Sequence, residues 1–380
     1  MNICLIYPGF PPETHSGGIG TFAFEFAMAL QKAGHAVTVI SRSDNTHTDA
    51  HEIIEGINVY RIADSASLSF RAGGELFHYE RIKNLVKKLD TQSTFDIIEA
   101  CDWGAEAYAL LSDYSARLLI RCHTPSFISE SYNPENPAYL SEKIKSCEKR
   151  LLSTAQKLIS PSQALLTEIS KYISFSGKTI VEPYLIQTND IPYKNIYSLS
   201  TIPSLLSVGR IEARKGQDII IQALHEISTR ELHLTLYGSD TPISASTSIL
   251  DQWLSEVPKL VASNVKHLGC IPRDSMLRSY KDFDIYICSS RFDNYPFTVL
   301  EAMAAGLPVI AHNVSGMKEQ IIDGETGMFF DGSPADLAEK ISILLADETL
   351  RAQIGRRARQ QIESHHSPKS IENSVTNMSN

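Results

Sequence analysis

Short apolar runs alternate with amphipathic helical patterns along most of this 380-residue chain, and the alternation stops and begins again once. Runs of Val, Ile and Leu without alternating polar residues are typical of strands buried on both faces, as in parallel sheets covered by helices. The interruption, at about residues 188–203, is polar, contains Pro and Ser, and has no clear period, which is typical of a linker. The sequence therefore predicts an α/β fold with two doubly wound parallel-sheet domains.

We predict a first domain at residues 1–187, a second at residues 188–366 and a tail at residues 367–380. The predicted strands of the first domain are Ile3–Tyr7, Val37–Ile40, Ile57–Ile62, Asp96–Ala100, Leu118–Cys122, Lys157–Ser160 and Thr179–Val181. Those of the second domain are Leu205–Val208, Leu232–Tyr237, Val265–Leu268, Ile285–Cys288 and Pro308–Ala311. The first predicted helix has an apolar face made of Phe22, Ala23, Phe26, Ala27 and Leu30. The tail is polar and weakly patterned; it could form a helix that returns to the first domain, or be disordered.

Composition argues against several classes of protein. The 43% hydrophobic content is enough for two ordinary domains with separate cores. A formal net charge of -9 argues against nucleic acid as a partner. The six cysteines lack the spacing of metal or redox sites, and no apolar run reaches the roughly 18–20 residues of a membrane span. Because the N-terminus also resembles a first strand more than a signal peptide, we expect a soluble cytoplasmic protein.

The segment Tyr286–Gly327 carries the densest set of candidate site residues. Asp293 lies in a Pro-containing loop, and Glu301, separated from it by seven residues, is predicted to open a small-residue helix that ends at Gly306. A ligand at that helix entrance would meet free backbone N–H groups, the Thr298 hydroxyl and two carboxylates. Such a site can bind a phosphate through the N–H groups and ribose hydroxyls through Glu301. Alternatively, Glu301 is an ordinary stabiliser of a helix start.

Two basic residues, Arg210 and Lys215, follow the first predicted strand of the second domain in the sequence SVGRIEARKG. Loops at the carboxyl ends of parallel strands line the binding crevice of doubly wound folds. Arg210 offers a planar fork and Lys215 a point charge, so both could bind one diphosphate. The alternative is two solvated cations, one of them paired with Glu212.

The first domain has candidates at two predicted strand ends. Gly17 and Gly18, in PPETHSGGIG, precede the first helix, where a phosphate could approach the backbone closely; alternatively the loop is only flexible. His123 follows a strand in RCHTP and could bond a sugar hydroxyl or stabilise developing charge, although a lone histidine is more often structural. Gly18, Gly20 and Ala23 fit the dinucleotide fingerprint only weakly.

No metal site is predicted. None of the 12 histidines forms a pair with convincing metal-ligand spacing. The one Asp-x-Asp, Asp282 to Asp284, precedes a predicted strand, so we expect it at the strand end away from the candidate site.

Four motifs resemble, in their order and spacing, those of the retaining glycosyltransferases of family 4: GGIGTFAFEFAMAL, HTP, SVGRIEARKG and FDNYPFTVLEAMAAGLPVIAHNVSG. The resemblance covers nearly the whole chain and is strongest from about Leu205 to Phe330. It implies the GT-B fold, in which two Rossmann-like domains face each other across a central cleft. It also implies a nucleotide diphosphate sugar, UDP- or GDP-linked, as donor, with no further cofactor and no metal.

The resemblance implies a role for each candidate in the loops. Gly17 and Gly18 match a glycine loop near the donor's diphosphate. His123 matches a histidine that contacts the donor sugar. Arg210 and Lys215 match an Arg/Lys pair that neutralises the diphosphate.

The two acidic positions match the family with one departure. In the family the first acidic residue faces the transferred sugar and the second holds the ribose, roles implied here for Asp293 and Glu301. The first is usually Glu, and Asp293 is one methylene shorter, which could alter sugar selection. Pro296 occupies a position where many members have Gly, so one backbone donor is absent. The family also has an Asn-Gly-hydrophobic-Asp segment between the domains. This chain has no close match to it, and the most similar sequence is VEPYLIQTND.

We therefore expect transfer of a sugar to an acceptor hydroxyl with retention, in bacterial polysaccharide or glycolipid synthesis. The expected catalytic residues are His123, Asp293, Arg210 and Lys215. Two alternatives stay open: a sugar-nucleotide epimerase of the same fold, and a catalytically silent subunit that binds sugar nucleotides. A Rossmann oxidoreductase is disfavoured, because neither domain has a convincing dinucleotide fingerprint.

The acceptor, a carbohydrate or a lipid-linked molecule, is expected to contact variable loops of the first domain, Asp64–Phe77 and Ser126–Pro137. The stretch Glu142–Lys157 is basic and partly apolar, and a helix of this kind could lie on the inner face of an anionic membrane. The alternative is a solvated helix face packed on the sheet. The sequence does not define an oligomeric state.

Overall fold

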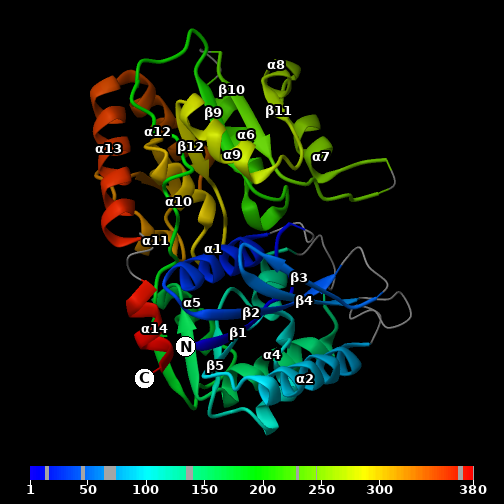
Figure 1. Ribbon diagram of the computed structural model, residues 1–380. Coiled ribbons are helices and arrows are strands. Elements are labelled where there is room, and N and C mark those ends of the chain that lie inside the picture. The colour runs from blue at the N-terminus through cyan, green and yellow to red at the C-terminus, as the bar shows by residue number, and fades with distance from the viewer. Residues whose placement is uncertain are drawn as a thin grey trace. The chain divides into compact units, whose positions relative to one another are not determined.

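The computed structural model describes residues 1–12, 17–43, 48–63, 74–133, 140–227, 231–244, 246–366 and 371–379. These residues divide into two units, which are described separately (Figure 1). Unit 1 contains the described part of Met1–Ser131, residues 140–185 and the helix at residues 371–379. Unit 2 contains Tyr132, Asn133 and the described part of residues 186–366. The sequence predicted a boundary after residue 187.

Unit 1 is built on an eight-stranded sheet in the order β3-β4-β2-β1-β5-β6-β7-β8. Neighbouring strands are parallel, except that the edge strand β3 is antiparallel to β4. The strands are β1(Asn2–Ile6), β2(Ala36–Ser43), β3(Ala50–Ile54), β4(Ile57–Ala63), β5(Ile97–Cys101), β6(Leu118–Arg121), β7(Lys157–Ser160) and β8(Lys178–Val181). Strands β5 and β6 are buried along their whole length, as their apolar runs predict.

The helices of unit 1 lie between these strands and at the end of the chain. They are α1(Gly18–Lys32), α2(Glu75–Gln92), α3(Ser126–Ser129), α4(Glu142–Thr154), α5(Gln163–Ser170) and α14(Ile371–Ser379), with 3₁₀ turns η2(Trp103–Ala105) and η3(Tyr108–Ser112). A further 3₁₀ turn, η4(Glu130–Tyr132), crosses the boundary between the units in the sequence. Helix α1 buries the predicted apolar face, including Phe22, Phe26 and Leu30. Each buried side chain of this size contributes about 1.5–3 kcal/mol, so the face holds α1 on the unit.

Unit 2 is built on a six-stranded, wholly parallel sheet in the order β11-β10-β9-β12-β13-β14. The strands are β9(Ser204–Val208), β10(His233–Tyr237), β11(Val265–His267), β12(Ile285–Cys288), β13(Val309–His312) and β14(Met328–Phe330). The helices are α6(Gln217–Glu226), α7(Ile249–Ser255), α8(Lys259–Ser263), α9(Arg273–Ser279), α10(Phe297–Ala304), α11(Met317–Gln320), α12(Pro334–Ala346) and α13(Glu348–His365), with 3₁₀ turns η5(Ala213–Lys215) and η6(Tyr280–Asp282). The two parallel-sheet α/β units confirm the predicted fold class.

The order of the strands places particular loops side by side. In unit 2, β9 lies between β10 and β12. Strands β10 and β11 are therefore added on one side of β9, and strands β12, β13 and β14 on the other side. The loops that follow β9 and β12 therefore leave the same edge of the sheet at a topological switch point, where doubly wound folds bind ligands. In unit 1, β1 lies in the same way between β2 and β5.

The structure corrects the prediction for Glu301. Helix α10 begins at Phe297, with Pro296 as its N-cap, so Glu301 lies one turn inside the helix and does not open it. The prediction failed because the preceding apolar residues were taken as loop, whereas Val299 and Leu300 are fully buried in the helix. Strands β3 and β14 were also missed: β3 is largely exposed, and β14 has only three residues.

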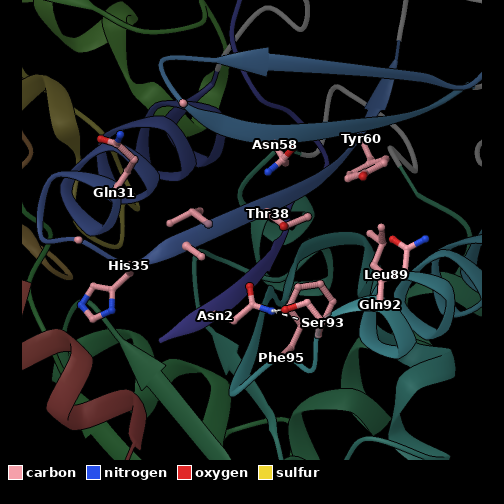
Figure 2. Close-up of a pocket in the computed structure, with 14 residues that line it drawn as sticks. Asn2, Gln31, His35, Thr38, Asn58, Tyr60, Leu89, Gln92, Ser93 and Phe95 are labelled. Carbon is pink, nitrogen blue, oxygen red and sulfur yellow. Dashed lines mark hydrogen bonds between the residues drawn. The ribbon is translucent and has the colours of Figure 1, made fainter.

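A groove of about 590 Å³ opens where strands β1, β2 and β4 of unit 1 begin (Figure 2). Its lining includes no charged side chain. Asn2 donates from Nδ2 to the carbonyl oxygen and to the Oγ of Ser93, at 3.1 and 3.2 Å. This edge holds the amino ends of the parallel strands, whereas His123 follows the carboxyl end of β6. The groove is therefore not part of the candidate site.

Within the described residues, no helix is both long and apolar enough to cross a membrane.

Candidate functional site

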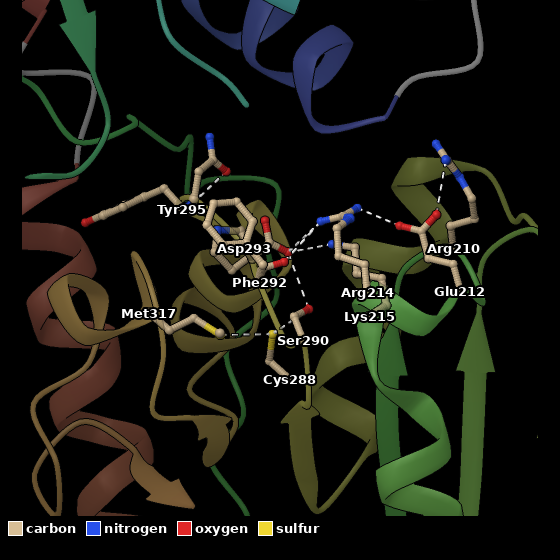
Figure 3. Close-up of polar contacts among 12 residues, drawn as sticks. Arg210, Glu212, Arg214, Lys215, Cys288, Ser290, Phe292, Asp293, Tyr295 and Met317 are labelled. Carbon is tan, nitrogen blue, oxygen red and sulfur yellow. Dashed lines mark hydrogen bonds and ion pairs between the residues drawn. The ribbon is translucent and has the colours of Figure 1, made fainter. Parts of the chain in front are cut away.

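A lysine and a buried aspartate meet at the carboxyl edge of the unit 2 sheet (Figure 3). Lys215, from the loop after β9, places Nζ 2.5 Å from Oδ2 of Asp293, in the loop after β12. The Oγ of Ser290 donates to the same oxygen at 3.4 Å. Asp293 is 7% exposed, whereas the Lys215 side chain is 19% exposed. The structure thus brings together two of the predicted residues, with the lysine on the side nearer to solvent.

The close approach of these two loops depends on Gly216. Its φ of +68° lies in the left-handed region, and a Cβ at this position would lie 2.2 Å from the carbonyl oxygen of Ser289. The Oγ of Ser289 in turn donates to the carbonyl oxygen of Lys215 at 3.0 Å. A glycine is needed both for the backbone conformation and for the space.

Arg214 is a member of this cluster that the sequence analysis missed. Its guanidinium donates to Oε1 of Glu212 at 2.7 Å and to the carbonyl oxygen of Phe292 at 3.2 Å, and Nη1 lies 4.0 Å from Oδ2 of Asp293. The signal was present, because Arg214 directly precedes Lys215 in the motif. The sequence analysis considered only Arg210 as the partner of Lys215 and therefore did not include Arg214.

Arg210 lies at the margin of the cluster. Its side chain is 44% exposed and pairs with Oε2 of Glu212 at 3.3 Å (Figure 3). In the described structure Glu212 thus pairs with Arg210 and Arg214, and Lys215 pairs with Asp293. The convergence of Arg210 and Lys215 on one diphosphate stays a prediction.

The cations keep both carboxylates of the cluster ionised. Burial by itself raises the pKa of Asp293, but Lys215 and Arg214 outweigh it and hold that pKa below its ordinary value. Burial likewise raises the pKa of Glu212, and Arg214, Arg210 and Lys215 together lower it below its ordinary value. Three cations against two carboxylates leave a net charge of +1, which attracts an anionic ligand.

Glu301 and Thr298 both lie on α10. Glu301 is 2% exposed; its Oε2 accepts from the hydroxyl of Tyr280 at 2.9 Å, and its Oε1 lies 3.1 Å from Nη2 of Arg273. These contacts fix the direction of the carboxylate, which an ordinary helix-start stabiliser would not need. Thr298 is in the first turn of α10, where backbone N–H groups point out of the helix.

His123 occupies a closed aromatic environment in unit 1. Its backbone N–H donates to Oδ1 of the buried Asp102 at 2.8 Å, and its ring lies against Tyr7, Phe22 and Tyr184 with centroids 5.7, 4.9 and 5.5 Å away. Burial, and secondarily the charge of Arg121, hold the pKa of His123 well below its ordinary value. The imidazole is therefore neutral.

The predicted glycine loop is only partly described. Gly17 is the N-cap of α1 and Gly18 is its first residue, whereas residues 13–16 of the motif lie outside the described residues. Phe22 of the same helix contacts His123, so α1 and the loop after β6 are neighbours within unit 1. In the predicted acceptor loops, residues 64–73 and 134–137 also lie outside the described residues.

Two basic side chains of α4, the helix for which membrane contact was considered, have partners within the chain. Lys145 lies 2.5 Å from Glu130 and 2.8 Å from Glu142. Lys149 lies over the rings of Phe127 and Tyr172. These contacts favour the interpretation of α4 as a solvated helix packed on the sheet.

No group of three or more possible metal ligands occurs in the part of the chain that the structure describes. Asp284 accepts from the backbone N–H and the Oγ of Ser204, where β9 begins, at 2.9 and 3.0 Å. It therefore lies at the amino end of the strands, as predicted.

Comparisons with known proteins match both halves of the chain. The family model described as Glycosyltransferase Family 4 matches residues 16–183, and the model described as Glycosyl transferases group 1 matches residues 197–361. The glycogen synthase of Mycobacterium tuberculosis is 26% identical over 395 residues, which cover 96% of this chain and 91% of that protein.

Solved structures resemble the whole chain. Sucrose-phosphate synthase from Thermosynechococcus elongatus has a TM-score of 0.79 at 19% identity, covering 99% of this chain and 97% of that one. HepE from Anabaena, solved in complex with UDP and glucose, has a TM-score of 0.69 at 18% identity, covering 98% of each chain. At these identities the likeness shows the fold.

Proposed function

Because the chain belongs to the group 1 glycosyltransferases of family 4 and has the GT-B fold, we propose that it transfers a sugar from a nucleotide diphosphate sugar to an acceptor hydroxyl with retention of configuration. The observation that carries this proposal is the pairing of Lys215 with the buried Asp293 at the carboxyl edge of the unit 2 sheet. The lysine can bind a phosphate oxygen while the carboxylate accepts from a sugar hydroxyl, so both halves of a donor find a partner.

Cleavage of the bond between the anomeric carbon and the β-phosphate oxygen leaves negative charge on the phosphate. Lys215, Arg210 and Arg214 supply positive charge for that oxygen, and the first turn of α10, at Thr298, supplies N–H groups. This set of donors can stabilise the leaving group alone, so we propose a metal-independent reaction. For retention, the acceptor attacks from the face that the phosphate leaves, and the departing phosphate takes the acceptor's proton.

The remaining predicted residues have complementary roles in this proposal. A carboxylate offers about four acceptor sites, so Glu301 can accept from ribose hydroxyls while Arg273 and Tyr280 fix its orientation. The neutral His123 contacts the transferred sugar. The backbone at Gly17 and Gly18 contributes to binding of the diphosphate.

The structure of HepE with UDP and glucose makes a UDP-linked sugar the first donor to test, and a GDP-linked sugar the second. We propose a carbohydrate or lipid-linked acceptor in bacterial polysaccharide or glycolipid synthesis. With a lipid-linked acceptor, the protein would bind at the inner face of the membrane. Reversing the charge of Lys145 and Lys149 would then weaken binding to anionic liposomes, and unchanged binding would remove the proposed membrane contact.

The test is a thermal-shift and calorimetric screen of UDP, GDP, ADP and their common sugar conjugates, followed by analysis of the products. We expect selective stabilisation by one nucleoside diphosphate, and release of that diphosphate with a product of unchanged anomeric configuration. An altered sugar nucleotide without acceptor would instead identify an epimerase. Donor binding without turnover, across a panel of acceptors, would identify a silent binding subunit.

A further inference from the structure

Tyr184 lies beside His123 in unit 1, and the proposed reaction assigns it no role. Its hydroxyl oxygen is 2.6 Å from Nδ1 of His123, and the two rings are stacked. The residues are 3% and 6% exposed. Because water has little access to this pair, the hydrogen bond is stronger and better defined than the same contact at the surface.

The direction of this hydrogen bond decides where the proton of His123 resides. A neutral imidazole carries one proton, so one ring nitrogen donates and the other accepts. An unprotonated imidazole nitrogen is a strong acceptor, and a phenol is a better donor than acceptor. These properties favour donation from the Tyr184 hydroxyl to Nδ1, with the proton of His123 on Nε2.

The segment that carries Tyr184 is anchored two residues earlier, at Glu182. Nη1 of Arg121 donates to Oε1 of Glu182 at 2.9 Å, and Nδ2 of Asn377, on α14, donates to Oε2 at 2.8 Å. Nζ of Lys157 donates to the carbonyl oxygen of Asn377 at 3.2 Å and so holds the end of α14. The last described helix of the chain is thereby connected to the strand end that carries Tyr184.

Arg121 makes this anchor rigid. Its guanidinium also donates to both oxygens of Glu99 at 3.0 and 2.9 Å, and it lies over the rings of Phe22 and Phe26. Displacement of Glu182 would take one of the two carboxylate partners of the buried Arg121 away, which is costly. Phe22 in turn packs on both Tyr184 and His123, so it connects the pair to Arg121.

We propose that Tyr184 is a positioning residue: its hydroxyl places the single imidazole proton of His123 on Nε2, and Glu182 and Asn377 hold Tyr184 where it can do so. Nε2–H is then a permanent hydrogen-bond donor. Such a donor suits the hydroxyl or phosphate oxygens of a nucleotide sugar. The effect on turnover rests on the proposed function, whereas the position of the proton does not.

The decisive experiment is nitrogen-15 NMR of the full chain with labelled histidine, in which the His123 signals are identified by their loss in His123→Gln. We expect a directly bound proton at Nε2 and none at Nδ1. In Tyr184→Phe this preference should be lost, with a fall in kcat/KM for the donor of about tenfold, as for loss of one buried hydrogen bond. Tyr79→Phe is the matched control, because Tyr79 is equally buried and donates to the backbone carbonyl of Gly104 at 2.9 Å.

A second variant tests the anchor without touching the tyrosine. Asn377→Ala should shift the His123 signals partly towards those of Tyr184→Phe and lower kcat/KM about threefold, whereas Asn373→Ala, at an exposed position of the same helix, should do neither. A proton on Nδ1 in the wild type, or an unchanged tautomer in a folded Tyr184→Phe, would overturn the proposal. If the wild type turned over no donor, the proposed function would fail while the NMR result still decided the role of Tyr184.

Discussion

The candidate residues of the two units differ in how they carry charge. In unit 2, Lys215 and Asp293 form an ion pair, and the lysine retains access to solvent. An ion pair of this kind can exchange a protein partner for a ligand oxygen. In unit 1, His123 is neutral, buried and enclosed by the rings of Phe22 and Tyr184. In the proposed reaction, the unit 2 cluster thus supplies positive charge for the leaving phosphate. His123, by contrast, can only form an uncharged hydrogen bond with a ligand.

Removal of the lysine should give the largest effect. Lys215→Ala takes away the cation nearest to Asp293, so we expect turnover of the donor to fall by about 10²–10³, as for loss of one preorganised group at a developing charge. The measurement is the initial rate of nucleoside diphosphate release. Lys340→Ala is the control, since Lys340 forms a similar ion pair with Asp336, at 3.2 Å, on α12. Near-normal rates in Lys215→Ala would mean that the charged cluster is not the donor site.

Glu301→Gln should give the second largest effect. The substitution keeps the shape but removes the charge that pairs with Arg273, and it weakens acceptance from ribose hydroxyls. Hydrogen bonds to charged groups contribute about 1.5–3 kcal/mol, so kcat/KM should fall more than tenfold. Comparing a nucleotide with its 2′-deoxy form separates the causes: wild type should discriminate between them, and the variant much less. Equal discrimination by both proteins would remove Glu301 from the ribose.

The sequence predicted the fold because the fold depends on patterns that are local. The apolar runs of β12 and β7 gave their strand limits, since each residue but Lys157 is buried. It missed β3, whose exposed residues carry no such signal, and placed the start of α10 one turn late. Whether an edge strand or the start of a helix is buried depends on which other elements pack on it. The local sequence pattern does not give this information.

The sequence predicted most residues of the candidate site, but it did not predict which of them contact one another. Lys215 and Asp293 were singled out, yet their pairing depends on the order of β9 and β12 in the sheet and on the space left by Gly216. Arg214 could have been singled out as the neighbour of Lys215 in the motif, but its contacts with Glu212 and with the loop after β12 could not be read from the sequence. Tyr184 was missed for a similar reason: sequence distance gave no sign that it bonds His123.

Arg214 is the second cation near Asp293 in unit 2. Arg214→Ala should lower kcat/KM for the donor by about five- to tenfold, less than loss of Lys215, because its guanidinium lies 4.0 Å from Asp293 and its charge is partly compensated by Glu212. Arg214→Lys keeps the charge but not the two-sided fork, so it should recover only part of the loss. Full recovery would show that only its charge matters.

A pH titration of stability tests the neutral state of His123 itself. Because its pKa in the folded protein lies well below 6.5, only the unfolded chain binds this proton as the pH falls below 6.5. The stability linked to His123 is therefore complete above pH 6.5 and is lost as the pH falls towards the folded-state pKa. The free energy of unfolding of wild type should drop between pH 6.5 and 5 more steeply than that of His123→Gln, by up to about 1.4 kcal/mol per pH unit. His225→Gln, which removes an exposed histidine of α6, is the control. Parallel curves for wild type and His123→Gln would mean that His123 takes up its proton in the folded state, and the contrast between a charged unit 2 cluster and a neutral histidine would be lost.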